Sequence, residues 1–518
     1  MRHAQDGPAG TVATGMSVDD GRLRRLTASR TVARGAVWNM VGRLGPLVVA
    51  VIATPFLVHD LGIARWGIFT LALSLIGMFG VFDFGFGRAL TRLIADRLAT
   101  GDEAAAASSV VTGIAVLVAL GVMGGGVMAW LARFYTETAL HLPPALTHEV
   151  LVALYVLCAS APLVILNGAL WGVLSAFQRF APANLLNLPI LAMYYVGPLI
   201  MLHFIDSLAA VMAVLVGCRL VMTIGYGVIC VRAMPSLRHG RLSWRAVLPV
   251  IRFGGWMTVS NLIWPVALYM DRFAIAGMLS AAMTAYYATP FDLIIRFSVV
   301  PIAIMQTAFP AMTSLYRSDA EAARHLFRRA SIAIVGLLFP AALVVVAFAE
   351  PLLRLWLGAG FALHSAEVLR LLGVGVVFMC ADTVPVGLLD GIGRPDVNAK
   401  LAAVSLVVYA PAVLVLIRLF GIEGAALAWT LREISIYLAR LFLCGRLYPP
   451  VRPDLAMLRP SLAAAFMALA AVAWLGAGPF VALSLPLAVA LFGVTIWLAS
   501  LHGGERHAVS NLLLRRAA

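Results

Sequence analysis

Charged residues are scarce in this chain. Lys, Arg, Asp and Glu make up 12% of its 518 residues, whereas about a quarter of the residues of a soluble protein are charged. Hydrophobic residues account for 62% of the chain, and the mean hydropathy is +0.96. This balance excludes a soluble globular protein. It predicts an all-α integral membrane protein, in which each membrane-spanning helix takes about 20 apolar residues.

Cysteine is also rare, and its placement argues against a metal site. All five cysteines lie in apolar runs without a metal-binding spacing: Cys158, Cys218, Cys230, Cys380 and Cys444. We therefore expect small core residues, no bound metal and no other cofactor. The first 30 residues lack the apolar stretch of a secretory signal peptide, so we expect them to form a disordered cytoplasmic tail.

Sequence signs of enzymatic chemistry are missing. There is no Walker A motif, and the longest gap expected on the outer side, residues 132–148, is too short for a catalytic domain. The chain carries a net charge of +14, but its basic residues are dispersed through short gaps rather than gathered in a stripe. These features argue against an enzyme and against a nucleic-acid partner. A membrane glycosyltransferase or polymerase is the alternative from another class.

The apolar runs are separated by gaps that alternate between basic and weakly charged. Every second gap is rich in arginine, as at residues 88–97 and 317–329. Because Lys and Arg are retained on the cytoplasmic side, this alternation places both termini in the cytoplasm. We expect fourteen spans, at residues 36–58, 66–87, 107–131, 149–173, 183–203, 208–232, 247–270, 282–311, 328–349, 363–389, 397–418, 423–445, 457–476 and 480–500.

The first 450 residues contain an internal repeat. Residues 35–38 correspond to residues 253–256, residues 178–184 resemble residues 393–398, and Arg219 corresponds to Arg432, so the offsets are about 213 to 218. Spans six apart enter the membrane from the same side, which predicts parallel repeats and two six-helix lobes around a central cavity. We expect a tail, two lobes and a pair of additional C-terminal helices, at residues 1–30, 31–240, 241–450 and 451–518.

Two segments near the start of the chain carry a family resemblance. Residues 61–69 read LGIARWGIF, and residues 83–92 read DFGFGRALTR, an Asp-x-Gly-x-Gly stretch followed by arginines. With the repeat, they resemble the Wzx-type polysaccharide transporter family of the multidrug/oligosaccharidyl-lipid/polysaccharide exporter superfamily, over roughly residues 30–450. The resemblance implies a flippase of the bacterial inner membrane. Its expected substrate is an undecaprenyl-pyrophosphate-linked oligosaccharide for O-antigen (lipopolysaccharide) or exopolysaccharide biosynthesis, moved by alternating access.

The resemblance also implies partners, namely membrane lipids, a polysaccharide polymerase and chain-length proteins. Two alternatives come from the same superfamily. A multidrug or cation exporter would favour acidic residues in its cavity, whereas the deepest charge of the first lobe is Arg43. A flippase for lipid-linked peptidoglycan precursors would fit the fourteen spans but has no matching motif elsewhere in the chain.

Four arginines lie well inside the apolar runs, where a cation is kept only if it has a partner or a functional role. They are Arg43, Arg219, Arg296 and Arg432. A planar guanidinium suits the oxygens of a pyrophosphate. In the lipid-flipping branches of the resembled superfamily the first and eighth spans line the cavity. The resemblance therefore makes Arg43 and Arg296 candidate pyrophosphate ligands, and Arg272 is a third candidate.

Structural pairing is the alternative for these arginines. Asp292 precedes Arg296 by four residues and shares its helical face, so the two could form an ion pair. We expect Arg219 and Arg432, at equivalent positions of the repeat, to be structural. Adjacent helical residues do not face one another, so the partner of Arg432 is expected on another helix.

Carboxylates inside the spans are candidates for coupling transport to H⁺ or Na⁺. Asp292 is the best placed of them, and Asp271, at the edge of the seventh span, is the second candidate. Asp382 is a further acidic residue of this group, whereas Asp83 and Asp390 lie near cytoplasmic span ends. We expect the tryptophans near span ends to anchor the protein at the membrane interface: Trp38, Trp66, Trp130, Trp171, Trp244 and Trp356.

Overall fold

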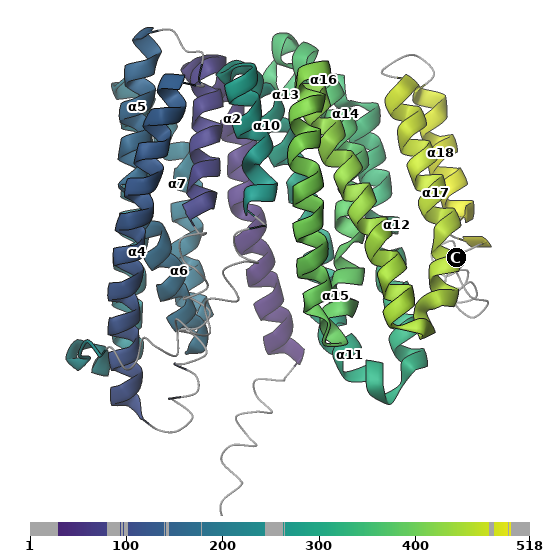
Figure 1. The fold of residues 1–518 in the computed structure, drawn as a ribbon, viewed down its shortest axis with the longest axis horizontal. Coiled ribbons are helices and arrows are strands. Elements are labelled where there is room, and N and C mark those ends of the chain that lie inside the picture. Colours follow the sequence, from purple (N-terminus) through teal and green to yellow (C-terminus); the bar gives the residue numbers. More distant parts are fainter. Residues whose placement is uncertain are drawn as a thin grey trace, which may run out of the picture.

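The computed structural model describes residues 29–79, 94, 97, 102–138, 140, 144–177, 179–243, 263, 265–475, 481–495 and 497–498. Within these residues all regular structure is helical, as the sequence predicts (Figure 1). The helices are α2 (Ser29–Phe79), α4 (Glu103–Thr138), α5 (Pro144–Cys158), α6 (Ala161–Ala176), α7 (Phe180–Phe204), α8 (Leu208–Ala233), α10 (Ala281–Ile295), α11 (Val299–Ser318), α12 (Ala320–Ala347), α13 (Ala349–Leu357), α14 (Ala359–Ala381), α15 (Thr383–Gly391), α16 (Pro395–Leu447), α17 (Arg452–Leu475) and α18 (Val481–Thr495), with short 3₁₀ turns η2 (Pro235–His239), η3 (Arg296–Ser298) and η4 (Pro449–Val451).

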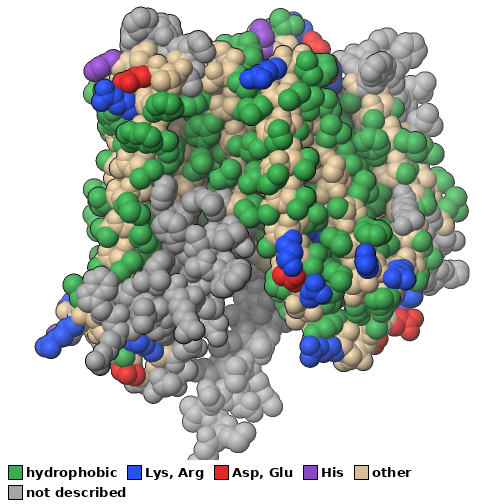
Figure 2. All heavy atoms as spheres, in the orientation of Figure 1, with side chains coloured by type: hydrophobic (Ala, Val, Ile, Leu, Met, Phe, Trp, Pro, Cys, Tyr) green, Lys and Arg blue, Asp and Glu red, His purple; other side chains and the backbone are tan. Residues whose placement is uncertain are grey.

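The helices form a bundle whose long axes run in nearly the same direction (Figure 1). Helices α4 to α8 gather on one side of the bundle, α11 to α16 gather on the other, and α2 and α10 meet between them. Helices α17 and α18 lie at the outer edge, against α12. Figure 2 shows that hydrophobic side chains cover the middle of one face, while charged side chains lie toward its two ends. This distribution is that of a protein embedded in a bilayer.

Ten helical segments of the described residues are long and apolar enough to cross a membrane. Some hold two of the expected spans. Helix α16 has 53 residues and would be about 80 Å long if straight, far more than the roughly 30 Å of a bilayer core. It is broken at Gly421, where φ is 65° and ψ is −139°. A Cβ atom on Gly424 would lie 1.9 Å from the carbonyl oxygen of Leu416, so the chain turns back on itself.

Helix α2 is broken in the same way at Gly62, where φ is 73°. Both breaks use a backbone conformation that glycine alone adopts readily. The expected span at residues 36–58 therefore lies before Gly62, and the expected span at residues 66–87 lies after it. The second span runs beyond the described residues. The total of fourteen spans and the lobe boundaries stay predictions.

Contacts repeated in the two halves support the internal repeat. The thiol of Cys230 in α8 donates to the carbonyl oxygen of Leu170 over 3.7 Å, and Cys444 in α16 donates to Pro385 over the same distance. The two cysteines are 214 positions apart, and their acceptors Leu170 and Pro385 are 215 positions apart. Both offsets lie within the range read from the sequence. The four cysteines other than Cys218 are buried, as expected for core residues.

Across the described residues, the hydrophobic core joins the two halves of the molecule at one end. Its largest cluster includes residues 57–79 of α2, residues 208–215 of α8 and most of the buried residues of α10, α12 and α14. A separate cluster fills the other end of the first half, with Val110, Leu170, Val173, Met222 and Tyr226. Among the described residues, the two halves therefore share a core near Trp66 and have separate cores at the opposite end.

Candidate functional site

A small cavity of about 40 Å³ lies where the two halves meet. It is lined by Leu47 and Thr54 from the first part of α2 and by Trp66 and Thr70 from the second part. Helix α7, helix α10, η3 and helix α13 complete its wall. This cavity brings together spans that are far apart in the sequence, as expected for a transporter whose site lies between two lobes.

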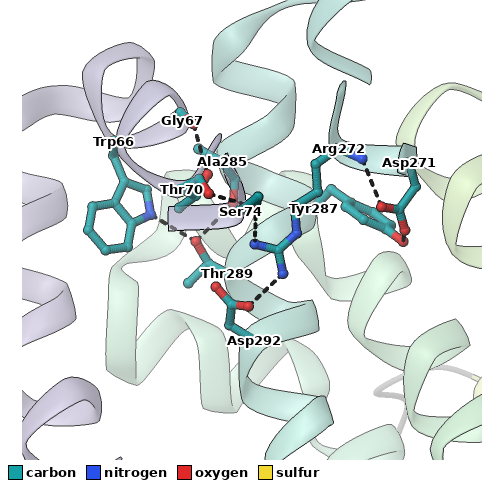
Figure 3. A network of polar contacts seen from close by, with 10 residues as sticks. All are labelled: Trp66, Gly67, Thr70, Ser74, Asp271, Arg272, Ala285, Tyr287, Thr289 and Asp292. Atoms are coloured by element: carbon teal, nitrogen blue, oxygen red, sulfur yellow. Dashed lines mark hydrogen bonds and ion pairs between the residues drawn. The ribbon is translucent and has the colours of Figure 1, made fainter. Parts of the chain in front are cut away.

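Charged side chains enter this cavity from α10 and η3. Asp292 and Arg296 both line it. Asp292 faces Arg272, whose Nη2 atom donates to the Oδ1 atom of Asp292 over 2.5 Å (Figure 3). Arg272 is 2% exposed, whereas the side chain of Asp292 is 39% exposed. The ion pair therefore has a buried cation and a carboxylate that reaches the cavity.

Arg272 also connects the two halves of the protein. Its Nη1 atom donates to the hydroxyl of Ser74 in α2 over 3.0 Å (Figure 3). The guanidinium lies over the rings of Phe291, at 5.2 Å, and Tyr269, at 5.5 Å, contacts that stabilise a cation with few polar neighbours. Arg272 is therefore buried and already paired, and its assignment as a pyrophosphate ligand stays a prediction.

Arg296 differs from Arg272 in both exposure and pairing. It is exposed, and in the described part of the chain no carboxylate lies within ion-pair distance of its guanidinium. Asp292, which shares its helical face, is paired with Arg272 instead. The side chain of Tyr195 on α7 interacts with Arg296. Of the two predicted pyrophosphate ligands whose side chains the structure describes, Arg272 and Arg296, only Arg296 is exposed at the cavity.

Arg43 lies in α2, but its side chain is outside the described residues. Leu47, one helical turn further along the same helix, lines the cavity. The assignment of Arg43 as a pyrophosphate ligand stays a prediction.

The second acidic candidate, Asp271, is fully buried away from the cavity. Its Oδ1 atom accepts from the backbone N–H of Arg272 over 2.8 Å. Its Oδ2 atom accepts from the hydroxyl of Tyr287 (Figure 3) and, over 3.4 Å, from that of Tyr409. Arg272 thus contacts both carboxylates. Its side chain binds Asp292, which reaches the cavity, and its backbone N–H binds the enclosed Asp271.

The arginines at equivalent repeat positions have matching surroundings. Arg219 lies over the ring of Tyr194 at 5.4 Å, and Arg432 lies over the ring of Tyr409 at 4.9 Å. Each tyrosine belongs to the span before its arginine. The Arg432 Nη1 atom also donates to the backbone carbonyl of Ala267 over 2.7 Å.

One detail of the prediction for Arg432 is wrong. Its carboxylate partner is the adjacent Glu433, at 2.6 Å, and not a residue of another helix. The long arginine side chain folds back along the helix, so the rule that neighbours in sequence point apart does not hold for it. The rule describes the Cβ direction and not the reach of a guanidinium.

The tryptophan prediction is right for one residue and wrong for another. Trp130 is 67% exposed, as an interfacial anchor should be. Trp66 is only 3% exposed, and its indole N–H donates to the hydroxyl of Thr289 over 2.8 Å. Trp356 donates to the backbone carbonyl of Val51 over 2.7 Å and lines the cavity. No sequence pattern signals these contacts, because each joins residues more than 200 positions apart.

Comparisons with known proteins agree with this architecture. Residues 32–316 match the family model described as polysaccharide biosynthesis protein. This match covers more than half of the chain. The chain belongs to that family.

Curated relatives extend the match over most of the chain. A Shigella flexneri protein that bears the name of an O-antigen transporter is 25% identical over 411 residues, which cover 78% of this chain and 95% of that protein. A Haloferax volcanii protein named as the flippase AglR is 23% identical over 416 residues, covering 77% of this chain and 80% of that protein.

Solved structures share the fold at low sequence identity. A multidrug resistance MATE family transporter of the MOP superfamily, in an inward-facing conformation, has a TM-score of 0.66 and 14% identity, covering 79% of this chain and 97% of that one. The lipid II flippase MurJ, in an inward closed conformation, has a TM-score of 0.64 and 11% identity, covering 89% and 97%. The all-α membrane fold predicted from the sequence is confirmed.

Proposed function

We propose that the protein flips a lipid-linked oligosaccharide across the bacterial inner membrane, for the synthesis of O-antigen or another surface polysaccharide. The family match and the two curated relatives, named for O-antigen transport and for flipping, support this substrate class. The pyrophosphate that joins sugar and undecaprenol is negatively charged, so it is the part of the substrate that costs most free energy to move through the hydrocarbon of the membrane. The transporter must supply cations for it.

The availability of Arg296 is the observation that carries this proposal. An exposed arginine at a cavity between two halves of a membrane protein, without a carboxylate partner among the described residues, suits an anionic ligand. Asp292 is neutralised by Arg272 at 2.5 Å, so it does not cancel the charge of Arg296. A cavity for cationic drugs would instead need an available carboxylate and no available arginine. Arg43 would add a second cation on the first half.

The division of the core supports an alternating-access movement. The two halves share a core near Trp66 and have separate cores at the opposite end, so the described contacts close one side of the interface. The arginine-rich gaps lie at the ends where the cores are separate, as at η2 and between α11 and α12. With the positive-inside rule, that side is cytoplasmic and both termini are cytoplasmic. The structure then corresponds to a state closed toward the periplasm.

Asp292 is the better candidate of the two carboxylates for coupling transport to H⁺ or Na⁺. It reaches the cavity, whereas Asp271 is enclosed by Arg272, Tyr287 and Tyr409. Binding of a cation to Asp292 would loosen its hold on Arg272 and, through Arg272, the contact with Ser74 in the other half. Polymerase and chain-length proteins as partners stay predictions.

The experiment that tests the function is depletion of the protein in its own cell. We expect loss of surface polymer and accumulation of lipid-linked repeat units that remain inaccessible to a periplasmic glycan-labelling reagent. Reintroduction of the wild-type chain should restore both. Unchanged polymer with an altered susceptibility to cationic drugs would instead support the multidrug alternative. Accumulation of peptidoglycan precursors would support the other superfamily alternative.

A further inference from the structure

A second and much larger hollow lies on the outside of the bundle, between α16 and α17. This groove has a volume of about 970 Å³. Its walls are apolar side chains from the second part of α16 and from α17, and Phe378 of α14 lies at its base. Three of its large side chains are exposed in the structure, namely Leu438 at 55%, Phe442 at 68% and Phe466 at 40%. A groove of this composition suits hydrocarbon chains.

Both charged residues of the groove are arginines. Arg446 and Arg452 line the groove at the end where α16 finishes and α17 begins, and both are exposed. The Nε atom of Arg452 donates to the backbone carbonyl of Gly445 over 2.7 Å, which fixes the side chain against the end of α16. In the described part of the chain, no carboxylate lies within ion-pair distance of Arg446 or Arg452.

The nearest acidic residue along α17 is occupied elsewhere. Asp454 is 1% exposed and lies against α12, where its carboxylate is 3.1 Å from Arg324 Nε and 3.5 Å from Arg328 Nε. These contacts tie the start of α17 to α12. They also keep the carboxylate away from the groove, so the charge of Arg446 and Arg452 remains available to a ligand.

We propose that this groove binds an anionic phospholipid, with phosphate at Arg446 and Arg452 and acyl chains along the apolar wall. A basic pocket between membrane helices on the cytoplasmic side is a typical site for such headgroups. Two arginines match the two phosphates of a diphosphatidylglycerol better than the single charge of phosphatidylglycerol.

The position of the groove distinguishes this lipid from the transported one. The groove shares no lining residue with the cavity that contains Asp292 and Arg296. It lies between the outer helix α17 and the second half of the protein, so its occupant does not have to move when the two halves rock. The bound phospholipid would join α17 to α16 as a structural ligand.

Native mass spectrometry of the full chain in detergent tests the proposal. The probes are diphosphatidylglycerol, phosphatidylglycerol, phosphatidylethanolamine and undecaprenyl phosphate, added separately. We expect diphosphatidylglycerol to be retained best and the zwitterionic lipid least. The double variant Arg446→Gln/Arg452→Gln should weaken its retention by about tenfold or more, because each arginine near a lipid headgroup contributes about 1 kcal/mol.

Matched variants separate the groove from general surface charge and from misfolding. Arg238→Gln/Arg317→Gln removes two exposed arginines outside the groove and should retain the lipid as the wild type does. Ala463→Trp fills the groove and should displace the lipid, whereas Ala471→Trp, on an exposed part of the same helix outside the groove, should not. Equal loss in the paired variants would overturn the proposal. So would unchanged retention in both groove variants, or stronger retention of undecaprenyl phosphate than of diphosphatidylglycerol.

Discussion

Trp66 in α2 and Thr289 in α10 form a direct hydrogen bond between the two halves of the protein, over 2.8 Å and with both side chains buried. One turn further along α2, Thr70 lines the same cavity, and one turn beyond it Ser74 accepts a hydrogen bond from Arg272 (Figure 3). One face of the second part of α2 therefore carries two hydrogen bonds to the second half. Opening of this side of the interface requires these contacts to break together.

The two halves pack closely at Gly67. A Cβ atom at this position would lie 1.8 Å from the backbone carbonyl oxygen of Ala281 in α10, and a backbone atom has little freedom to move away. We expect Gly67→Leu to force α2 and α10 apart and to abolish polymer export. Export is measured by surface polysaccharide in a depleted strain, alongside the amount of protein in the membrane.

Gly126→Leu is the matched control for Gly67→Leu. A Cβ atom on Gly126 would meet nothing within 4 Å, and the residue lies in the apolar helix α4. This control should support normal export. If Gly67→Leu is inserted normally and exports polymer as well as the control does, the contact between α2 and α10 has no part in the transport cycle.

Arg296 is the second position that we expect to decide transport. Arg296→Ala should reduce flipping by about tenfold or more, because a hydrogen bond to a charged group contributes about 1.5–3 kcal/mol. Arg296→Lys keeps the charge but not the planar fork, so it should restore part of the activity. Flipping is measured by the periplasmic accessibility of lipid-linked repeat units. Arg317→Ala, on an exposed part of α11, is the control. Full activity of a well-inserted Arg296→Ala variant would exclude Arg296 from the substrate site.

The ion pair of Arg272 and Asp292 should govern stability as well as transport. Arg272→Ala leaves the carboxylate without its cation and removes the donor to Ser74, so we expect a loss of about 3 kcal/mol in the free energy of unfolding. Asp292→Asn keeps an oxygen acceptor for the guanidinium and should cost less. The measurement is thermal unfolding in detergent, followed by intrinsic fluorescence. Destabilisation by Arg272→Ala without any by Asp292→Asn would show that the pairing with Asp292 is not the dominant contact of Arg272.

Much of the fold is visible in the sequence because its signals are local. Apolar runs of about 20 residues predict the helices, and alternate arginine-rich gaps predict their direction. The pairing of Cys230 with Leu170 and of Cys444 with Pro385 is consistent with the repeat offset. Even the break at Gly421 falls between two expected spans, although the sequence did not show that the two helices would be joined without a loop.

The site was less predictable because its contacts are not local. The sequence suggested pairing of Arg296 with Asp292, four residues apart on one helix. In the structure Asp292 binds Arg272, which is buried in a different helical segment, residues 265–278. The role of Trp66 could not be read for the same reason. An aromatic residue near a span end looks like an interfacial anchor until the other half of the protein covers it.

The orientation in the membrane can be tested with introduced cysteines. Ser318 precedes α12 and is exposed among arginine-rich residues, and Glu137 lies near the opposite end of α4 and is also exposed. The native cysteines offer little background, because four are buried and the half-buried Cys218 can be replaced by serine. We expect a membrane-impermeant maleimide added to intact cells with a permeabilised outer membrane to label Glu137→Cys. Ser318→Cys should be labelled only after the inner membrane is opened. Labelling of Ser318→Cys in intact cells would reverse the orientation, and with it the assignment of the closed side of the interface to the periplasm.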